Sequence, residues 1–276
     1  TAELIQSLQT TVTSSNLPLF IAVDQEGGKV SRFSFPDPIT MKSQTDIKNE
    51  SDAYAVCFAR GRLLKNLGVN INFSPVIDLG TSKDQFIFSR TFNGDVINVT
   101  KLGLSLAKGY RDSGVFPTVK HFPGHGLTSI DTHKNQAFSK PDLPALAKHL
   151  LPFWYAVNAN MELIMVSHLQ IEALDKLFPS SLSFNTITKL LRSLFGYHGV
   201  IITDDLGMGA ITKSFTLSQA AVLAVEAGND IILAIRPFSD YEKMIGAVKN
   251  AISSGEISEN RINESVRRII ELKIKL

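Results

Sequence analysis

Six nearly continuous apolar runs recur along the chain, and each is followed at once by polar residues. The runs are rich in β-branched residues and hardly alternate with polar positions, which is typical of parallel strands buried on both faces. Helical patterns lie between them. The sequence therefore predicts a parallel α/β fold, with strands at residues 19–23, 69–73, 116–119, 163–166, 200–202 and 230–235.

Glycines mark the expected ends of three helices. Residues 53–67 precede Gly68, and residues 217–227 precede Gly228. Ser239 and Glu242 form the pattern of a capping box for a third helix, which ends at Ser254 before Gly255. Two more helices are expected from apolar residues on one face: residues 142–158 (Leu143, Leu146, Leu150, Phe153 and Trp154) and the last helix (Ile262, Val266, Ile269, Ile270 and Ile274).

The alternation of strand and helix favours a TIM-type (β/α) barrel, in which the carboxyl ends of all strands face one site. Such a barrel has eight strands, and this sequence supplies six. No linker, low-complexity stretch or internal repeat divides the chain, so we expect residues 1–276 to be a single catalytic barrel domain. Either two strands escape the pattern or they lie upstream, and a first residue of Thr1 rather than Met favours the second. A doubly wound open sheet is the alternative, although no Gly-x-Gly-x-x-Gly motif or P-loop follows any of these strands.

Composition narrows the function classes. The 276 residues carry a net charge of +2, which is too weak to favour nucleic acid or an anionic membrane as a partner. No apolar stretch approaches the roughly 18 residues of a membrane-spanning helix. The single Cys57 excludes an intrachain disulfide framework. No cofactor is expected, and the cellular compartment and oligomeric state are left open.

Residues 117–133 are the richest in chemistry, since they hold three of the six histidines. Lys120 and His121 end a predicted strand, and a Gly- and Pro-rich loop then leads to Asp131 and His133. A carboxylate two residues from an imidazole can bond one ring nitrogen and leave the other free to pass protons. The loop glycines, Gly124 and Gly126, would let it move.

Further polar residues follow the other predicted strands. Glycoside cleavage needs a carboxylate on one side of the anomeric carbon and a proton donor on the other. Asp204 or Asp205 suits the first role, and the loop that ends at His133 offers the second. Together the strand ends would present a set suited to a neutral, polyhydroxylated substrate: Asp24, Glu26, Arg32, Asp78, Lys120, His121, His133, His168, Asp204 and Asp205.

Several of these groups also have structural interpretations. Glu26 lies in Gln-Glu-Gly-Gly, which is typical of a tight turn whose carboxylate bonds backbone amides. Asp78 is expected to support a neighbouring residue through hydrogen bonds. Asp205 is expected to cap or orient the residue next to it. His125 is expected to pack within the loop, and Cys57 to be inert core.

Three motifs resemble glycoside hydrolase family 3, and within it the β-N-acetylglucosaminidase branch. They are Lys-His-Phe-Pro-Gly-His-Gly followed by Asp-Thr-His (residues 120–133), Val-Asp-Gln-Glu-Gly-Gly (23–28) and Thr-Asp-Asp-Leu-Gly-Met (203–208). The resemblance covers nearly the whole chain from about Leu19. The middle residue of Asp-x-His is Thr132, where relatives more often carry Ser.

The resemblance implies a barrel enzyme that retains anomeric configuration and removes terminal N-acetylglucosamine from peptidoglycan or chitin fragments. It implies Asp204 as the nucleophile and His133, supported by Asp131, as the general acid/base. It assigns sugar binding to Asp24, Arg32, Arg90, Lys120 and His121, and it implies no metal.

Two rival functions remain from the residues themselves. His121, His125, Asp131 and His133 are residue types that could ligate a metal in a metal-dependent TIM-barrel hydrolase. A sugar-binding module that has lost its chemistry is the other possibility, and the intact set of Asp131, His133 and Asp204 weighs against it.

Overall fold

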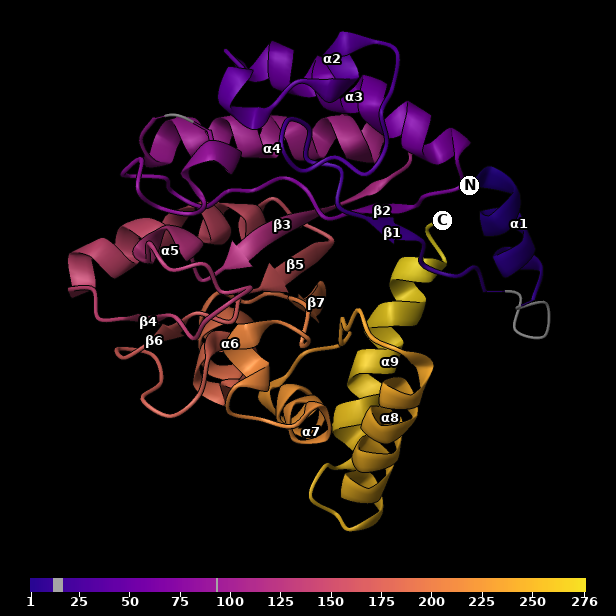
Figure 1. Ribbon diagram of the computed structural model, residues 1–276, viewed down its shortest axis with the longest axis vertical. Coiled ribbons are helices and arrows are strands. Elements are labelled where there is room, and N and C mark those ends of the chain that lie inside the picture. Colours follow the sequence, from indigo (N-terminus) through magenta and orange to yellow (C-terminus); the bar gives the residue numbers. More distant parts are fainter. Residues whose placement is uncertain (12–16, 93) are drawn as a thin grey trace.

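A curled sheet of parallel strands forms the centre of the molecule (Figure 1). The computed structural model describes residues 1–11, 17–92 and 94–276. The strands lie in the order β1 (Ala22–Val23), β2 (Ile71–Asn72), β3 (Phe116–Phe122), β5 (Leu163–Val166) and β7 (Val200–Thr203), and every neighbouring pair is parallel. The predicted parallel α/β fold is confirmed.

The sixth predicted strand also lies beside the sheet, although it forms only an isolated parallel bridge between Ile231 and Ile202. The amide of Ile231 donates to the carbonyl of Ile201 and its carbonyl accepts from Thr203. The carboxyl ends of all six predicted runs therefore lie at the same edge of the main sheet. A separate small parallel sheet joins β4 (Phe138–Ser139) and β6 (Gln170–Ile171).

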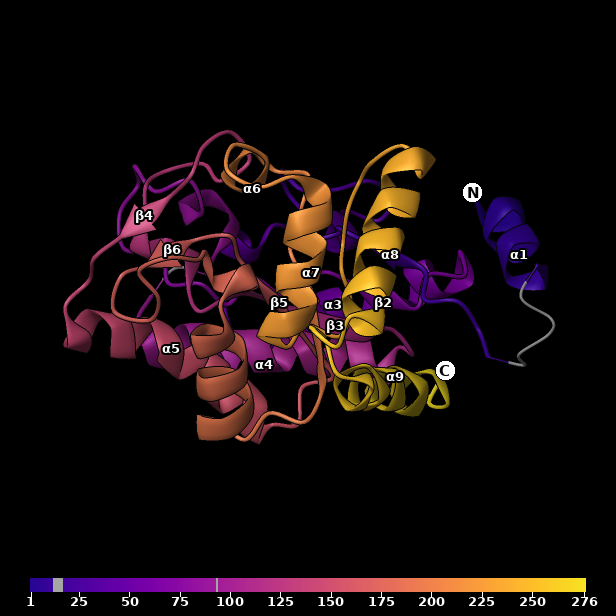
Figure 2. The ribbon, with the colours of Figure 1, turned by 90° about the horizontal axis from the view of Figure 1, so that it is seen from below.

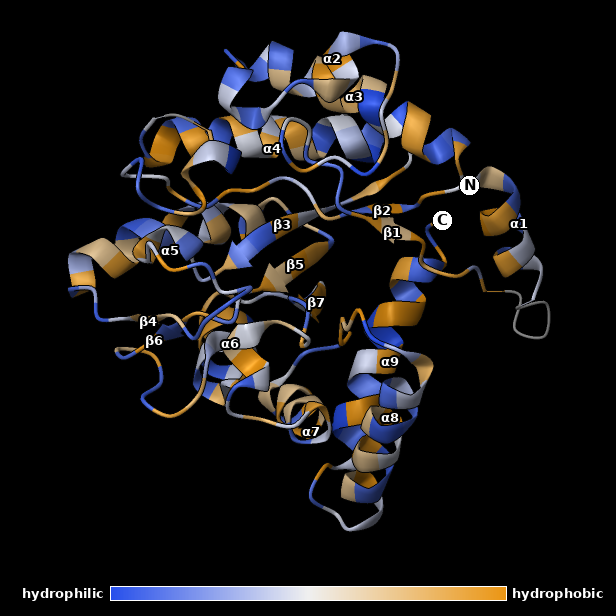
Figure 3. Ribbon diagram, viewed as in Figure 1, coloured by the Kyte–Doolittle hydropathy of each residue, from blue (hydrophilic) through white to orange (hydrophobic). Residues whose placement is uncertain are grey.

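Burial explains why these runs form strands. Every residue of β5 and β7 is buried, and their registers pair Leu163 with Val200 and Ile164 with Ile201. Apolar side chains are therefore needed on both faces, as the continuous runs indicated. Figure 3 shows β3 becoming hydrophilic toward its arrowhead, where the run reaches Lys120 and His121.

Helices cover the sheet from both sides (Figures 1 and 2). Contacts join α4 and α5 to β3, and α9 to β7, while α7 and α8 lie side by side. The helices are α1 (Ala2–Thr10), α2 (Pro38–Met41), α3 (Glu50–Asn66), α4 (Val96–Asp112), α5 (Leu143–Asn158), α6 (Gly209–Thr212), α7 (Leu217–Ala227), α8 (Phe238–Ser253) and α9 (Glu259–Lys273). Short helical turns occur at Gln44–Asp46, Phe88–Arg90, His125–Leu127 and Ser180–Leu182, and a π-helix spans Asn185–Leu194. Among the described residues, no helix combines the length and apolarity needed to cross a bilayer.

The predicted helix ends at glycine are confirmed, but the predicted capping box is wrong. Gly68, Gly228 and Gly255 follow α3, α7 and α8 with positive φ angles. Helix α8 begins at Phe238 after Pro237, with no side-chain cap, so Ser239 and Glu242 both lie inside the helix. The capping box instead begins α7, where Thr216 pairs with Gln219.

Two predicted apolar faces are only partly buried. In α5, Leu146 and Phe153 enter the core, but Leu143 and Trp154 are exposed. In α9, Val266 and Ile270 are exposed, as is Ile274 directly after the helix, and the buried residues are Ser265 and Leu272. The sequence periodicity identified both helices correctly. Neither α5 nor α9 turns its whole apolar stripe toward the core, although Leu150 of α5 also packs against it.

Candidate active site

A cavity of about 210 Å³ lies at the carboxyl ends of the strands. Seven of the eight residues that the sequence assigned to catalysis or sugar binding line it, namely Asp24, Arg32, Arg90, Lys120, His121, His133 and Asp204. Val30, Phe86 and Met165 complete its wall. The eighth residue, Asp131, lies behind His133 and bonds its ring. Side chains from segments up to 180 residues apart therefore converge on one small space.

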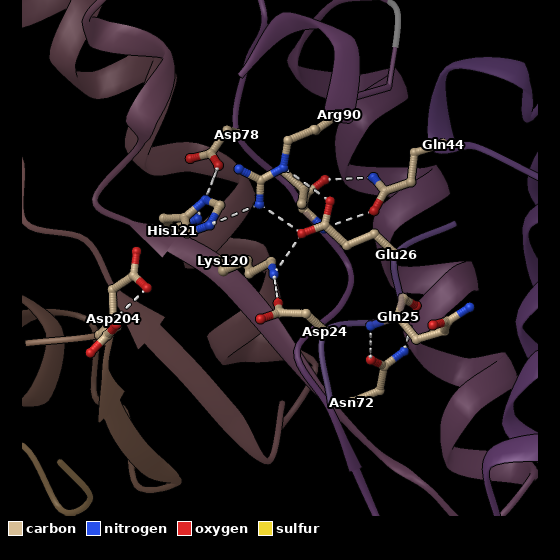
Figure 4. A network of polar contacts seen from close by, with 12 residues as sticks. Asp24, Gln25, Glu26, Gln44, Asn72, Asp78, Arg90, Lys120, His121 and Asp204 are labelled. Carbon is tan, nitrogen blue, oxygen red and sulfur yellow. Dashed lines mark hydrogen bonds and ion pairs between the residues drawn. The ribbon is translucent and has the colours of Figure 1, made fainter. Parts of the chain in front are cut away.

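Buried ion pairs form the floor beside this cavity (Figure 4). The Lys120 Nζ lies 2.6 Å from Asp24 Oδ1 and 2.6 Å from Glu26 Oε1. Arg90 binds the same Glu26 carboxylate with two nitrogens, at 2.7 and 3.1 Å. The interpretation of Glu26 as a turn residue bonded to backbone amides is therefore wrong for its carboxylate, which binds two cations instead.

Charge pairing keeps the residues of this floor ionised. Burial alone would raise the pKa of Glu26, but the charges of Lys120 and Arg90 outweigh it and hold that pKa at about 2. Burial alone would likewise lower the pKa of Lys120, but Asp24 and Glu26 raise it. Lys120 and Arg90 are thus held as fixed cations beside the cavity.

The turn that carries Glu26 is fixed by Arg60, a buried residue of α3. Its guanidinium donates to the carbonyls of Glu26, Thr40 and Lys42 at 2.6–2.7 Å. This role could not be predicted from the sequence, because Arg60 lies inside an apolar helical pattern. Cys57, one turn earlier, is buried with its pKa raised to about 11 by burial, in line with the expected inert core residue.

Asp78 organises the two histidines of the Lys-His-Phe-Pro-Gly-His-Gly motif. One carboxylate oxygen lies 2.7 Å from His121 Nδ1, and the other accepts from the His125 amide at 2.6 Å. Burial raises the pKa of Asp78 and lowers the pKa of His121 well below its usual value. A neutral His121 that donates Nδ1–H to Asp78 presents an unprotonated Nε2 on its other side, 3.4 Å from Arg90.

The loop pair Asp131 and His133 has the geometry that the sequence indicated. His133 Nδ1 lies 2.8 Å from Asp131 Oδ1, and the His133 amide donates to the same oxygen at 3.0 Å. The other ring nitrogen, Nε2, is left for a ligand in the cavity. Phe86 packs its ring against this imidazole, with 5.5 Å between ring centroids. Sequence reasoning missed Phe86, because nothing in its surroundings distinguishes it from a core aromatic.

The neighbouring aspartates at the end of β7 have different surroundings. Asp205 accepts hydrogen bonds on Oδ1 from the amides of Gly207 and Ile235, at 2.8 and 3.0 Å. Asp204 lines the cavity and accepts from the Asp205 amide at 2.8 Å. Burial opposes its ionisation, but nearby His168, His121 and the Asp205 amide lower the pKa of Asp204 to about 2. Asp204 is therefore a carboxylate at neutral pH, available to a ligand.

His168 is a buried histidine with both ring nitrogens bonded. Nδ1 lies 2.7 Å from Ser181 Oγ, and Nε2 lies 2.9 Å from the Asp205 carbonyl. The predicted candidates for metal ligation are similarly engaged, with His121 on Asp78 and His125 on Thr132. Within residues 1–11, 17–92 and 94–276, no three His, Cys, Asp or Glu side chains are grouped as a metal ion would require.

Comparison with known proteins identifies the family. Residues 1–272 match the profile described as the glycosyl hydrolase family 3 N terminal domain. The chain belongs to glycosyl hydrolase family 3. The resemblance inferred from the three motifs is thereby confirmed, together with the barrel-type fold class.

Within family 3, the chain is similar to beta-hexosaminidases. It is 34% identical to beta-hexosaminidase A of Pseudoalteromonas piscicida, over 96% of this chain and 48% of that protein. It is 33% identical to beta-hexosaminidase LpqI of Mycobacterium tuberculosis, over 93% of this chain and 68% of that protein. A solved family 3 beta-N-acetylglucosaminidase from Paenibacillus sp. str. FPU-7 has a TM-score of 0.92 and 36% identity, over 99% of this chain and 53% of that one. The chain thus spans about half the length of the first and third of these relatives.

Proposed function

We propose that the protein is a retaining β-N-acetylglucosaminidase that removes terminal N-acetylglucosamine from peptidoglycan or chitin fragments. The observation that carries the proposal is the convergence of Asp204 and His133 on one cavity. The His133 ring is bonded through Nδ1 to Asp131, and the Asp204 carboxylate accepts from the Asp205 amide. The names of the beta-hexosaminidase relatives support the substrate class.

In the first step, the Asp204 carboxylate attacks the anomeric carbon and the glycosidic bond breaks. Protonated His133 donates from Nε2 to the departing oxygen, while the Asp131 carboxylate holds Nδ1–H and stabilises the positive ring. In the second step, neutral His133 takes a proton from water, which attacks the anomeric carbon and releases Asp204. Two inversions at one carbon restore the original configuration.

The remaining cavity residues bind the sugar in this proposal. Lys120 and Arg90 are held as donors by Glu26, and Asp24 offers a carboxylate oxygen as an acceptor for hydroxyl groups. Arg32 and His121 line the same cavity. Fixed donors and acceptors suit a neutral, polyhydroxylated ring because none of them must reorganise when the sugar binds.

The test is release of nitrophenol from 4-nitrophenyl N-acetyl-β-glucosaminide by the purified protein, with the sugar's anomeric configuration followed by NMR. We expect the β anomer to form first. Initial release of the α anomer would overturn the retaining mechanism, and binding of N-acetylglucosamine without turnover would favour a non-catalytic sugar-binding module.

His133→Ala should separate proton donation from the rest of catalysis. A nitrophenolate leaves without help, whereas an alkoxide needs a proton in the transition state. We expect kcat/KM to fall on the order of 10²- to 10⁴-fold for an alkyl glycoside and far less for the nitrophenyl glycoside. Equal losses on both substrates would argue against the acid role.

Chelation should leave the activity unchanged. The proposed steps use only a carboxylate and an imidazole, so dialysis against EDTA is expected to preserve kcat/KM. A large loss that Zn²⁺ or another divalent ion restores would favour the rival metal-dependent hydrolase.

A further inference from the structure

The loop that carries His133 is bonded to the segment that carries Asp204, although about seventy residues separate them in sequence. The Thr132 carbonyl accepts from the Ala210 amide at 3.1 Å, and the His133 carbonyl accepts from the Gly209 amide at 2.9 Å. Gly209 and Ala210 are the first two residues of α6, which begins five residues after Asp204. The loop carbonyls therefore satisfy amides that have no partner within the helix.

Thr132 anchors the same loop from its other side. Its side chain is buried although it lies between the more exposed Asp131 and His133. Its Oγ1 lies 2.9 Å from Nε2 of His125, which is itself buried. The His125 amide donates to Asp78, the carboxylate that also holds His121. This chain of bonds connects the loop to the floor of the cavity.

Gly209 allows the close approach of the two segments. A Cβ atom at this position would lie 2.5 Å from the Lys134 carbonyl oxygen and 3.0 Å from that of His133. Both are backbone atoms of the loop, so a methyl group could be accommodated only by moving the loop away. Gly126 has a comparable role nearer the cavity floor, since its Cβ would lie 1.8 Å from the Leu79 carbonyl oxygen. Gly126, which the sequence pattern suggested as a source of loop motion, is therefore needed for close packing against Leu79.

We propose that Thr132, His125 and Gly209 form a latch that fixes the His133 loop against the Asp204 segment. The latch makes Thr132 and Gly209 positioning residues, and this inference rests on the proposed acid role of His133. A retaining enzyme needs its proton donor and its nucleophile at a set separation. Misplacement by about 1 Å can cost on the order of 10²-fold in rate, so an anchored donor has a direct kinetic consequence.

The experiment compares Thr132→Val, which replaces the hydroxyl group with a methyl group of similar size, with Thr132→Ser, which keeps the hydroxyl group, and with Gly209→Ala. Gly246→Ala is the matched control, because a Cβ there meets no atom within 4 Å. We expect T132V and G209A to lose roughly 10- to 100-fold more kcat/KM on an alkyl glycoside than on the nitrophenyl glycoside. T132S and G246A should stay near the wild-type values on both substrates.

Amide hydrogen exchange in the unliganded protein tests the latch without activity. T132V should exchange faster at Gly209 and Ala210, whose amides donate to the loop, and G209A faster at Ala210. T132S and G246A should exchange there at the wild-type rate. Unchanged exchange in both T132V and G209A, or equal kinetic losses on the two substrates, would overturn the latch.

The two proposals fail in different ways. An inactive wild type, or a His133→Ala variant with no leaving-group dependence, would count against the proposed function, and the exchange data would still decide whether the loop is latched. A His133→Ala variant that behaves as expected beside an unaffected T132V and G209A would reject the latch alone.

Discussion

Replacement of Asp204 by alanine is expected to reduce kcat/KM for 4-nitrophenyl N-acetyl-β-glucosaminide roughly 10⁴- to 10⁶-fold, as removal of a nucleophile does in other covalent enzymes. The carboxylate lines the cavity and is ionised at neutral pH, with its pKa at about 2. Asp205, the neighbouring carboxylate at the end of β7, accepts two backbone hydrogen bonds on Oδ1 and is not among the residues that line the cavity.

Sodium azide provides a chemical control for this variant. A small anion can enter the space left by the carboxylate and attack the anomeric carbon once, so D204A should form an α-glycosyl azide that NMR identifies. Asp205→Asn is the matched variant, since its amide oxygen can still accept from Gly207 and Ile235. It should keep its activity within about tenfold of the wild type. If D205N were as inactive as D204A and azide rescued D205N instead, Asp205 would be the nucleophile and Asp204 the supporting residue.

The sheet could be predicted from the sequence because its strands are buried on both faces. That burial demands long apolar runs, and in each case a polar residue marks the point where the chain leaves the sheet. The orientation of α5 and α9 could not be predicted in the same way. Leu143 and Val266 fit an apolar stripe, but whether a stripe faces the sheet depends on the neighbouring elements.

Prediction of the candidate site had a similar limit. Asp204, His133 and Lys120 follow strands or lie in a dense polar motif, so their sequence positions indicate where they lie. The partners of Glu26 could not be inferred, because Arg90 and Lys120 are 64 and 94 residues away and only the fold joins them. Phe86 and Gly209 were missed for the same reason, since each acts by touching a loop that is distant in sequence.

Glu26→Gln is expected to lower the free energy of unfolding by about 3–5 kcal/mol at pH 7, measured by urea denaturation. The substitution keeps the shape of the side chain and removes the charge that Lys120 and Arg90 share. Two buried cations are then left next to each other, and Asp24 is the carboxylate that still contacts Lys120 directly. Substrate affinity should fall as well, because these cations line the cavity.

The pH dependence of stability should change in the same variant. The pKa of Glu26 is lowered from 4.5 to about 2 in the folded protein, so its contribution is complete above pH 4.5 and is lost as the pH falls toward 2. That difference corresponds to about 3 kcal/mol. The stability gap between the wild type and E26Q should therefore narrow over this window. A gap that stays constant down to pH 2 would contradict the assignment of the charge to Glu26.

Two further variants separate the buried pair from charge loss in general. Glu271→Gln removes an exposed partner of Arg267 in α9 and should cost less than about 1 kcal/mol. Adding Lys120→Met to E26Q removes one of the two cations that Glu26 pairs in the wild type, so the double variant should lose less than the sum of the single losses. Strict additivity would mean that Glu26 and Lys120 stabilise the fold independently, and the idea of a shared ion-pair floor beside the cavity would have to be abandoned.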